Sequence, residues 1–185
     1  MCGRFTQYQA QVRYLERLNW QAPLAFEPSD EPIERYNVTP TTHVQLLHLD
    51  EDGLRMNAVP WGYVPHWASG QGKRPPAINA RLETAVTSRC WSALWKHGRS
   101  LVPADDWYEW VKDPTDAKRK QPYYIKLKSD GPMFFAAIGD FARGPTSSPG
   151  TPTALRLSPA PAIRAWSTYT TGCRLCCHPM WRKNG

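Results

Sequence analysis

The chain has 185 residues, a length that suits one domain with a sizeable core and is short for two. No apolar run approaches the ~20 residues of a membrane span, and the N-terminus lacks the basic and then apolar layout of a secretory signal. The five cysteines are irregularly spaced and fit a reducing compartment. These features lead us to expect a soluble, cytoplasmic protein that has no membrane partner.

The formal net charge of +7 is unevenly distributed along the chain. Residues 144–185 hold five basic and no acidic residues, whereas the preceding residues are nearly balanced. Composition therefore gives only weak support for nucleic-acid binding. The nine tryptophans are a better indication, because aromatic faces stack on unpaired bases. Packing in a core explains each tryptophan equally well.

The first two residues are Met1 and Cys2. Because Cys2 is small, we expect Met1 to be removed, which leaves an α-amine and a thiol on one residue. The pKa of such an amine is near ~7.7–8 and that of a thiol near ~8.5, so both are available as nucleophiles at neutral pH. An aldehyde would form an imine with the amine, and the thiolate would close a thiazolidine ring. A chance Met-Cys start has no such role, because a covalent nucleophile needs an activating partner.

The first predicted elements are a helix and a hairpin. Tyr8, Val12, Leu15 and Leu18 recur at helical spacing and predict an amphipathic helix over about 8–19. Alternating residues over 43–49 and a strand over about 54–63 flank the turn signal at 52–53. A loop rich in glycine and proline then leads to residues 78–84. The remaining predicted elements are a helix over 88–96, a strand over 100–103, a charged loop up to 120, and a hairpin with strands 123–128 and 133–138.

Segments in which apolar and polar residues alternate outnumber those with helical spacing, and most connections are short turns. We therefore expect the α+β class, with a strongly curved, largely antiparallel sheet or partial barrel and a few helices packed outside it. Residues 1–143 contain neither a phosphate-binding glycine loop nor a paired metal motif.

Three polar residues are candidates for chemistry. Glu109 lies between Trp107 and Trp110, which should desolvate its carboxyl and raise its pKa into the range useful for acid–base catalysis. Asn79 offers a neutral hydrogen-bond donor, and Arg81 a guanidinium suited to phosphate. Each alone could equally be an ordinary solvated surface residue.

Five motifs, considered together, resemble the SOS response-associated peptidase (SRAP) family in order and spacing. They are Met1-Cys2-Gly3-Arg4-Phe5, Arg35-Tyr36-Asn37-Val38-Thr39-Pro40, Trp61-Gly62-Tyr63, Ile78-Asn79-Ala80-Arg81-Leu82-Glu83-Thr84 and Trp107-Tyr108-Glu109-Trp110. The resemblance covers about residues 1–143. It implies an SRAP-like domain over 1–143 that removes its own Met1 and crosslinks to abasic sites in single-stranded DNA.

The resemblance also implies roles for individual residues. Cys2 would be the nucleophile, Asn79 would orient the amine and the sugar, and Glu109 would transfer protons. No cofactor or metal is implied, and we expect a monomer that is nucleoid-associated when bound to DNA. The residues that would line the DNA channel are Arg4, Asn37, Pro40, Trp67, Arg81, Arg89 and Trp110.

Residues 144–185 depart from the family pattern. Family members continue with a further buried strand and an Asp-Ile-His-Asp-Arg segment whose histidine completes the site. This chain instead has six prolines and no acidic residue in that region, where ordinary composition would give several acids. We therefore expect an aberrant, poorly ordered tail over 144–185.

A shift of reading frame offers an explanation of this tail. One choice of synonymous codons for residues 165–172, read one base earlier, encodes Gly-Met-Val-Asp-Ile-His-Asp-Arg. The same offset turns residues 154–159 into Gly-Phe-Thr-Ile-Val-Thr, a plausible buried strand. The frameshift hypothesis would remove the site histidine from this chain.

Three alternatives remain open. Cys173, Cys176, Cys177 and His178 could form a metal site or a redox pair; the spacing of Cys173 and Cys176 suits zinc, although no second pair lies at a distance. Class II glutamine amidotransferases also begin Met-Cys-Gly, but lack the other motifs. A non-covalent single-stranded DNA binder would use the tryptophans and arginines without Cys2.

Overall fold

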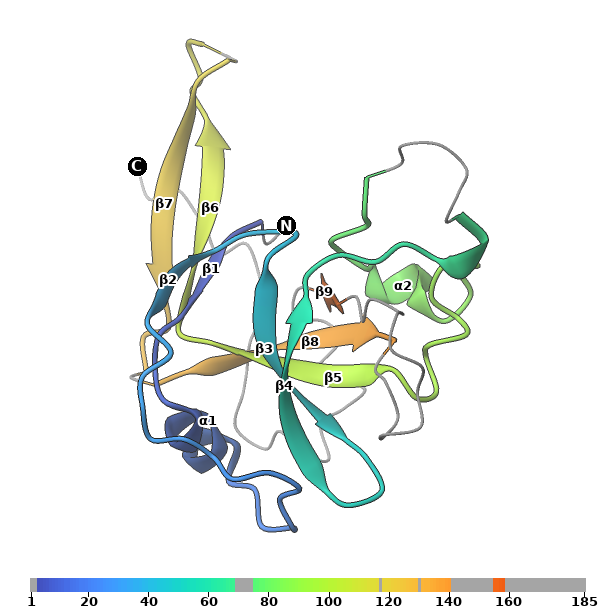
Figure 1. The fold of residues 1–185 in the computed structure, drawn as a ribbon. Helices are drawn as coiled ribbons and strands as arrows, with labels where there is room; N and C mark the ends of the chain where they lie inside the picture. The colour runs from blue at the N-terminus through green and yellow to red at the C-terminus, as the bar shows by residue number, and fades with distance from the viewer. Residues whose placement is uncertain (1–2, 69–74, 117, 130, 141–154, 159–185) are drawn as a thin grey trace.

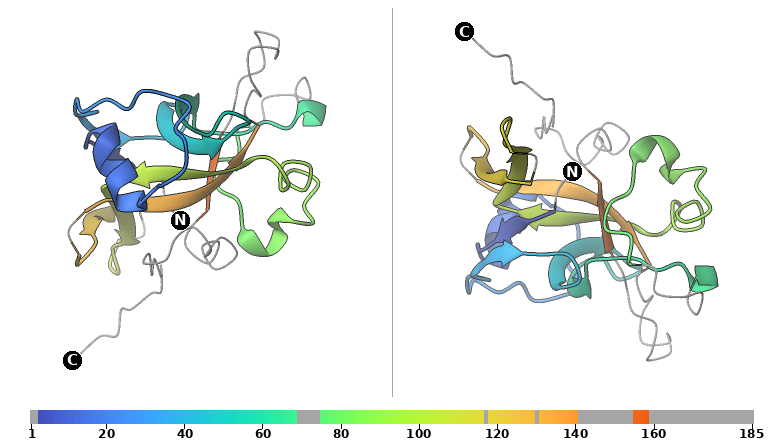
Figure 2. Two further views of the ribbon diagram at one scale, coloured as in Figure 1. Left: turned by 90° about the horizontal axis from the view of Figure 1, so that it is seen from below. Right: turned by 90° about the horizontal axis from the view of Figure 1, so that it is seen from above.

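The computed structural model describes residues 3–68, 75–116, 118–129, 131–140 and 155–158, and Figures 1 and 2 show their arrangement. The strands form two antiparallel sheets, of order β2-β1-β6-β7 and β4-β3-β5-β8-β9. The strands of the first sheet are β1 (Phe5–Gln7), β2 (Arg35–Val38), β6 (Asp106–Lys112) and β7 (Lys120–Lys126). Those of the second are β3 (His43–Leu49), β4 (Leu54–Pro60), β5 (Arg99–Ala104), β8 (Met133–Gly139) and β9 (Leu155–Ser158). The helices are α1 (Gln11–Leu18), the 3-10 helix η1 (His66–Ala68) and α2 (Leu82–Ala85).

The predicted α+β class and antiparallel pairing are confirmed. The strands divide between two sheets, which do not close into a barrel over the described residues. Helices α1 and α2 lie at opposite ends of the molecule, and the β6–β7 hairpin projects beyond the body (Figures 1 and 2).

The core lies between the inner faces of the two sheets. Phe5 of β1 is fully buried, with its ring centroid 5.4 Å from that of Trp61 and 5.6 Å from that of Phe135. Strand β8 is buried along its whole length, in keeping with its apolar sequence. Burial of such aromatic and aliphatic surface is the main favourable term in folding.

Gln7 connects the two sheets through a buried amide. Its Nε2 donates to the carbonyl oxygens of Gln45 and Pro103, each at 2.8 Å, and its Oε1 accepts from the Gln45 amide at 3.0 Å. Strands β3 and β5 pair only at Leu47 and Leu101. The Gln7 amide thus satisfies backbone groups that the diverging strands leave open, as buried polar groups require.

Helix α1 packs on the second sheet. Its Tyr14 is buried in a cluster that includes Leu47, Leu54 and Phe134. Asn19 ends the helix in the left-handed conformation with φ of 52°, and its amide donates to the Glu16 carbonyl oxygen. The predicted helix is confirmed but starts later, at Gln11, because Gln9 and Ala10 continue the extended N-terminal segment.

Two predicted elements are wrong. Residues 88–97 form successive turns rather than a helix. Most of their backbone hydrogen bonds run from residue i to residue i−3, such as that from the Trp91 amide to the Ser88 carbonyl oxygen at 2.9 Å. Gly98 ends this segment in close contact with β8, where a Cβ would lie 2.0 Å from the Gly139 oxygen. The apolar side chains of Trp91 and Leu94 are buried. Their helix-like spacing therefore reflects packing against the core and not a regular helix.

The predicted hairpin of 123–128 with 133–138 is also wrong. Strand β7 pairs with β6 and β8 pairs with β5, so residues 127–132 cross from one sheet to the other. The chain does turn away between β7 and β8, but the strands with which they pair, β6 and β5, lie earlier in the chain.

Within the tail over 144–185, β9 pairs antiparallel with β8, with Leu157 opposite Ala137. A four-residue strand needs little more than extended backbone that can complete the ladder. Residues 144–154 and 159–185 lie outside the described residues, as does the cysteine cluster at 173–178.

Candidate functional site

The described N-terminal end lies beside the segment that bears Glu109. Phe5 pairs with Trp107 on one side and with Val38 on the other. The Tyr108 amide donates to the Arg4 carbonyl oxygen at 2.9 Å. Cys2 itself lies outside the described residues. This pairing brings Gly3 and Arg4 to the part of the first sheet that also carries Asn37, Glu109 and Trp110.

Glu109 is half-buried in the middle of β6, opposite Tyr123 of β7. Side chains alternate along a strand, so Glu109 points to the same side of the sheet as Trp107, which packs against the core. The carboxyl therefore lies on the inner face, at the edge of the apolar region.

Asn79 lies in a segment that is fixed by backbone and ring contacts. The carbonyl oxygen of the preceding Ile78 accepts from Trp61 Nε1 at 2.9 Å, and Ala77 pairs with Tyr63 in an isolated bridge. The Asn79 side chain is half-buried. Arg81 follows at the N-cap of α2 and is exposed, so its guanidinium is available to an anion.

Two of the predicted DNA-binding pairs are in direct contact. The Arg4 guanidinium carbon lies 5.3 Å from the Trp110 ring centroid, and that of Arg89 lies 4.3 Å from the Trp67 ring centroid. Both distances fit cation–π interactions. Stacking on a ring holds the cation without neutralising it, so both groups can still attract phosphate.

The other two predicted residues lie near the link between β2 and β3. Asn37 is exposed on β2, and Pro40 is half-buried in the turn that follows. The amide of Thr41 donates to the Trp61 carbonyl oxygen at 2.8 Å, which fixes this turn against the end of β4.

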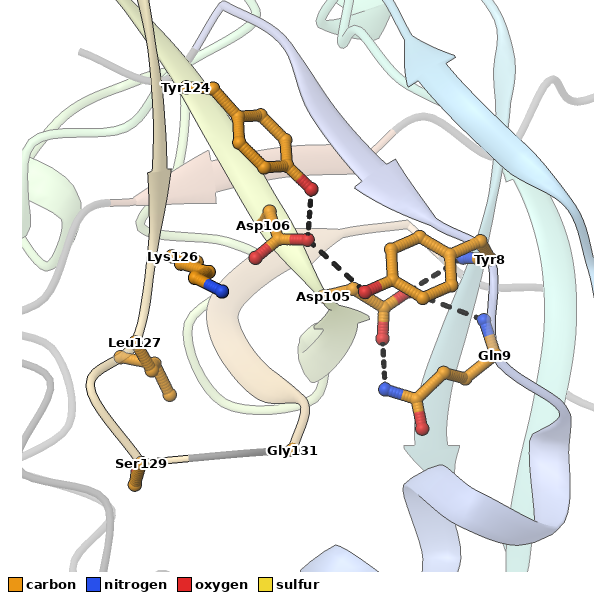
Figure 3. A pocket seen from close by; sticks show the side chains of 9 residues that line it. All are labelled: Tyr8, Gln9, Asp105, Asp106, Tyr124, Lys126, Leu127, Ser129 and Gly131. Carbon is orange, nitrogen blue, oxygen red and sulfur yellow. Dashed lines mark hydrogen bonds between the residues drawn. The ribbon is translucent and has the colours of Figure 1, made fainter.

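A buried acidic pair, Asp105 and Asp106, was not predicted from the sequence (Figure 3). Asp105 accepts from the amides of Tyr8 and Gln9 at 2.6 and 3.3 Å, from Gln9 Nε2 at 2.7 Å, and from the Tyr14 hydroxyl at 2.8 Å. This single carboxylate holds the segment between β1 and α1. The adjacent acids in a β segment were the available signal, since buried carboxylates need several donors.

Asp106 lines a cavity of about 180 Å³ with Tyr8, Tyr124 and Lys126 (Figure 3). Its Oδ2 accepts from both tyrosine hydroxyls, at 3.3 Å from Tyr8 and 2.5 Å from Tyr124. Burial and the charges of Asp106 and Asp105 raise the pKa of Tyr8 to about 12. Burial and the hydrogen bond to Asp106 also raise the pKa of Tyr124. Both phenols thus remain protonated donors at neutral pH.

Among the described residues there is no group of three or more His, Cys, Asp or Glu side chains that could hold a metal ion. None of the helices within the described ranges is long and apolar enough to cross a membrane.

The fold is thus that of a two-sheet antiparallel α+β protein with an N-terminal strand beside a tryptophan-flanked carboxylate. The family model for SOS response associated peptidase (SRAP) matches residues 1–158, and the chain belongs to this family. The resemblance found from the five motifs is thereby confirmed.

Named relatives agree with this assignment. The chain is 45% identical over 148 residues to the abasic site processing protein YedK of Escherichia coli, covering 78% of this chain and 63% of the relative. It is 33% identical to the abasic site processing protein YoaM of Bacillus subtilis, covering 75% of this chain and 59% of the relative. The chain thus spans less than two thirds of the length of these relatives.

A solved structure supports the fold. A phage-related protein of Bordetella bronchiseptica superimposes with a TM-score of 0.67 and 34% identity, covering 88% of this chain and 70% of that one.

Proposed function

We propose that this protein recognises abasic sites in single-stranded DNA and crosslinks to them through Cys2. The observation that carries the proposal is the position of the N-terminal strand, whose Arg4 carbonyl oxygen accepts from the Tyr108 amide next to Glu109. The printed names of the relatives, abasic site processing proteins, support the same substrate. The family match favours this function over a glutamine amidotransferase.

The chemistry requires three steps that balance without a cofactor. Hydrolysis of the Met1–Cys2 peptide bond consumes one water and frees the α-amine. The amine then condenses with the ring-opened sugar aldehyde and releases one water as the imine forms. Finally the Cys2 thiolate adds to the imine carbon, the nitrogen takes a proton, and a thiazolidine results. The protein therefore acts as its own peptidase and as a crosslinking protein.

In this proposal Glu109 carries the protons and Asn79 orients the amine and the sugar. A half-buried carboxyl on the inner face is suited to exchange protons with the amine and the departing water. Arg4, Arg81 and Arg89 would contact phosphates. Asn37, Pro40, Trp67 and Trp110 would line the channel. We propose that the protein acts as a cytoplasmic monomer on nucleoid DNA.

The test is incubation with single-stranded DNA that carries one abasic site, followed by denaturing electrophoresis. The wild-type chain should give a denaturant-stable adduct, and Cys2→Ala should give none while it still binds intact single strands. Hydrolysis of glutamine without an adduct would identify an amidotransferase. Salt-sensitive binding by the wild type without any adduct would identify a non-covalent binder.

We also propose that residues from about 144 onward arise from a shifted reading frame. No acid occurs in residues 144–185, and the family match, which continues to residue 158, does not extend beyond it. Restoring the frame by one base should increase solubility, and should increase Met1 removal more than ring closure, because only the former would need the family histidine. Resequencing that gives an unshifted open frame, with protected amides throughout 159–185, would contradict this proposal.

A further inference from the structure

The outer face of the first sheet carries a continuous group of aromatic side chains. Because Trp107 points to the core, the alternation of β6 turns Asp106, Tyr108 and Trp110 to the other side. Tyr124 lies directly opposite Tyr108 on β7. We use the name aromatic face for the side chains of Tyr8, Tyr36, Tyr108, Trp110 and Tyr124.

The members of the aromatic face touch one another. Tyr8 and Tyr36 are stacked, with ring centroids 5.3 Å apart and planes at 16°. The ring of Tyr108 lies 5.2 Å from that of Tyr124 and 6.4 Å from that of Trp110. Despite these contacts, Tyr36 remains 59% exposed, Tyr124 55% and Trp110 37%. Large aromatic side chains gathered and exposed together mark interaction surfaces, whereas isolated ones do not.

The rings are held in place by their own hydroxyls. Tyr8 and Tyr124 both donate to the buried Asp106 carboxylate, and Tyr108 donates to the Tyr36 carbonyl oxygen at 3.3 Å. Side chains fixed before binding lose little rotamer entropy when a ligand arrives. With three hydroxyls engaged within the protein, the surface offers mainly ring faces. Such a surface suits a flat aromatic partner.

Charge on the aromatic face favours an anionic partner. Arg4 stacks on Trp110 at one end, and within the described residues its buried Nε has no hydrogen-bond partner. Lys126 is exposed opposite Asp106, whose carboxylate is covered by the two phenols. Cations beside ring faces are the combination that binds unpaired nucleic acid, since every base has a face to stack and a phosphate follows it.

We propose that the aromatic face binds unpaired bases of the DNA strand that flanks the lesion. The proposal rests on the proposed function, which supplies the single strand, and extends the site from Trp110 and Arg4 onto the tyrosines. The strand would leave the region of Glu109, pass Trp110 and stack on the tyrosine rings. Asp106 acts as a positioning residue, because it orients two of these rings and does not touch the DNA.

The test compares two abasic single strands, one ending close to the lesion on either side and one with long flanks, by anisotropy for binding and electrophoresis for crosslinking. Tyr36→Ala and Tyr124→Ala should each weaken binding of the long strand about five- to tenfold, the loss of one stacked base. Binding and crosslinking of the short strand should stay unchanged. Leu49→Ala, 57% exposed on the other sheet, is the matched control and should have no effect on either strand.

Salt dependence and a conservative variant sharpen this test. A stacking contact releases no counterions, so Tyr36→Ala should leave the slope of log affinity against log salt unchanged. Tyr36→Phe should bind like the wild type, because it keeps the ring. Asp106→Asn should weaken binding of the long strand only.

Each result decides a distinct question. Equal affinity of Tyr36→Ala and wild type for the long strand would overturn the proposal while leaving crosslinking intact. Wild-type failure to crosslink either strand would instead refute the proposed function, and binding of intact strands would still test the aromatic face. Unfolding midpoints of all variants identify a loss caused by misfolding. Loss of affinity for both strands alike would overturn the proposal in favour of a structural role.

Discussion

The two sheets of this molecule differ in what covers them. In the second sheet, β8 is buried at all seven positions and neighbouring strands supply most of the core. In the first, β7 is exposed at six of its seven positions, and the outer face carries tyrosines and a tryptophan. Under the proposed function, changes in the second sheet should therefore act on folding, and changes on the outer face of the first sheet should act on DNA binding.

Asp105 and Gln7 join the two sheets and belong to both roles. They fix the segment from β1 to α1, and hence the strand that leads to the N-terminus. A substitution at either residue should therefore lower both stability and activity.

The largest expected effect on stability is that of Trp61→Ala. The side chain is fully buried, contacts Phe5 and donates to the Ile78 carbonyl oxygen. We expect a loss of about 3–5 kcal/mol in the free energy of unfolding, measured by urea denaturation. The matched control is Trp110→Ala, which should change stability by less than about 1 kcal/mol but weaken DNA binding. Similar losses of stability in both variants would erase the proposed difference between the sheets.

The second largest effect on stability is expected for Asp105→Ala. It leaves the donors of Tyr8, Gln9 and Tyr14 without their acceptor, and a buried donor without a partner costs about 1–3 kcal/mol. We expect a total loss of roughly 3 kcal/mol in the same assay, together with slower crosslinking. Asp30→Asn, at an exposed position, should leave both quantities nearly unchanged. Slower crosslinking without lower stability would show a role other than holding the segment.

Arg81→Ala should act on DNA alone. Loss of one phosphate contact should weaken binding to all sequences and reduce the slope of log affinity against log salt by about 0.7–1. Titration of intact single strands at several salt concentrations measures this. The control is Arg13→Ala, which removes an exposed arginine of α1 that is paired with Glu16. An altered base preference with an unchanged slope would contradict the phosphate role.

The smallest effect concerns alkaline pH. The pKa of Tyr8 is raised to about 12, so between about pH 10 and 12 the unfolded chain loses this proton while the folded chain keeps it. Stability that is complete below pH 10 should therefore fall as the pH rises towards 12. Tyr8→Phe should make this fall shallower, as followed by urea midpoints. An unchanged slope in that variant would show that Tyr8 does not contribute.

Local patterns predicted the elements that local forces determine. The turn at Gly53 was predicted from an Asp-Gly pair, and there φ is 138° and Asp50 Oδ1 accepts from the Gly53 amide at 3.2 Å. The partner of β7 could not be predicted in this way, because pairing with β6 or with β8 satisfies the same alternation. The helix predicted over residues 88–96 was wrong for a related reason. The spacing of Trp91 and Leu94 reflects which side chains are buried and does not determine the backbone hydrogen bonds.

The site shows the same division. The candidate roles of Asn79, Glu109 and the arginines came from the family resemblance, which rests on short local motifs, and they remain predictions. The Asp106 network was not predicted, because it joins Tyr8 and Tyr124, 98 and 18 residues away in the chain. Such contacts depend on how β1, β6 and β7 pair in the first sheet.

The most direct test of the account is mass spectrometry of the protein after reaction with an abasic single strand and nuclease digestion. The account predicts that Met1 is absent and that the N-terminal peptide carries the sugar remnant on Cys2, with the mass of an aldehyde adduct less one water. An adduct on a lysine, or on a chain that retains Met1, would contradict it.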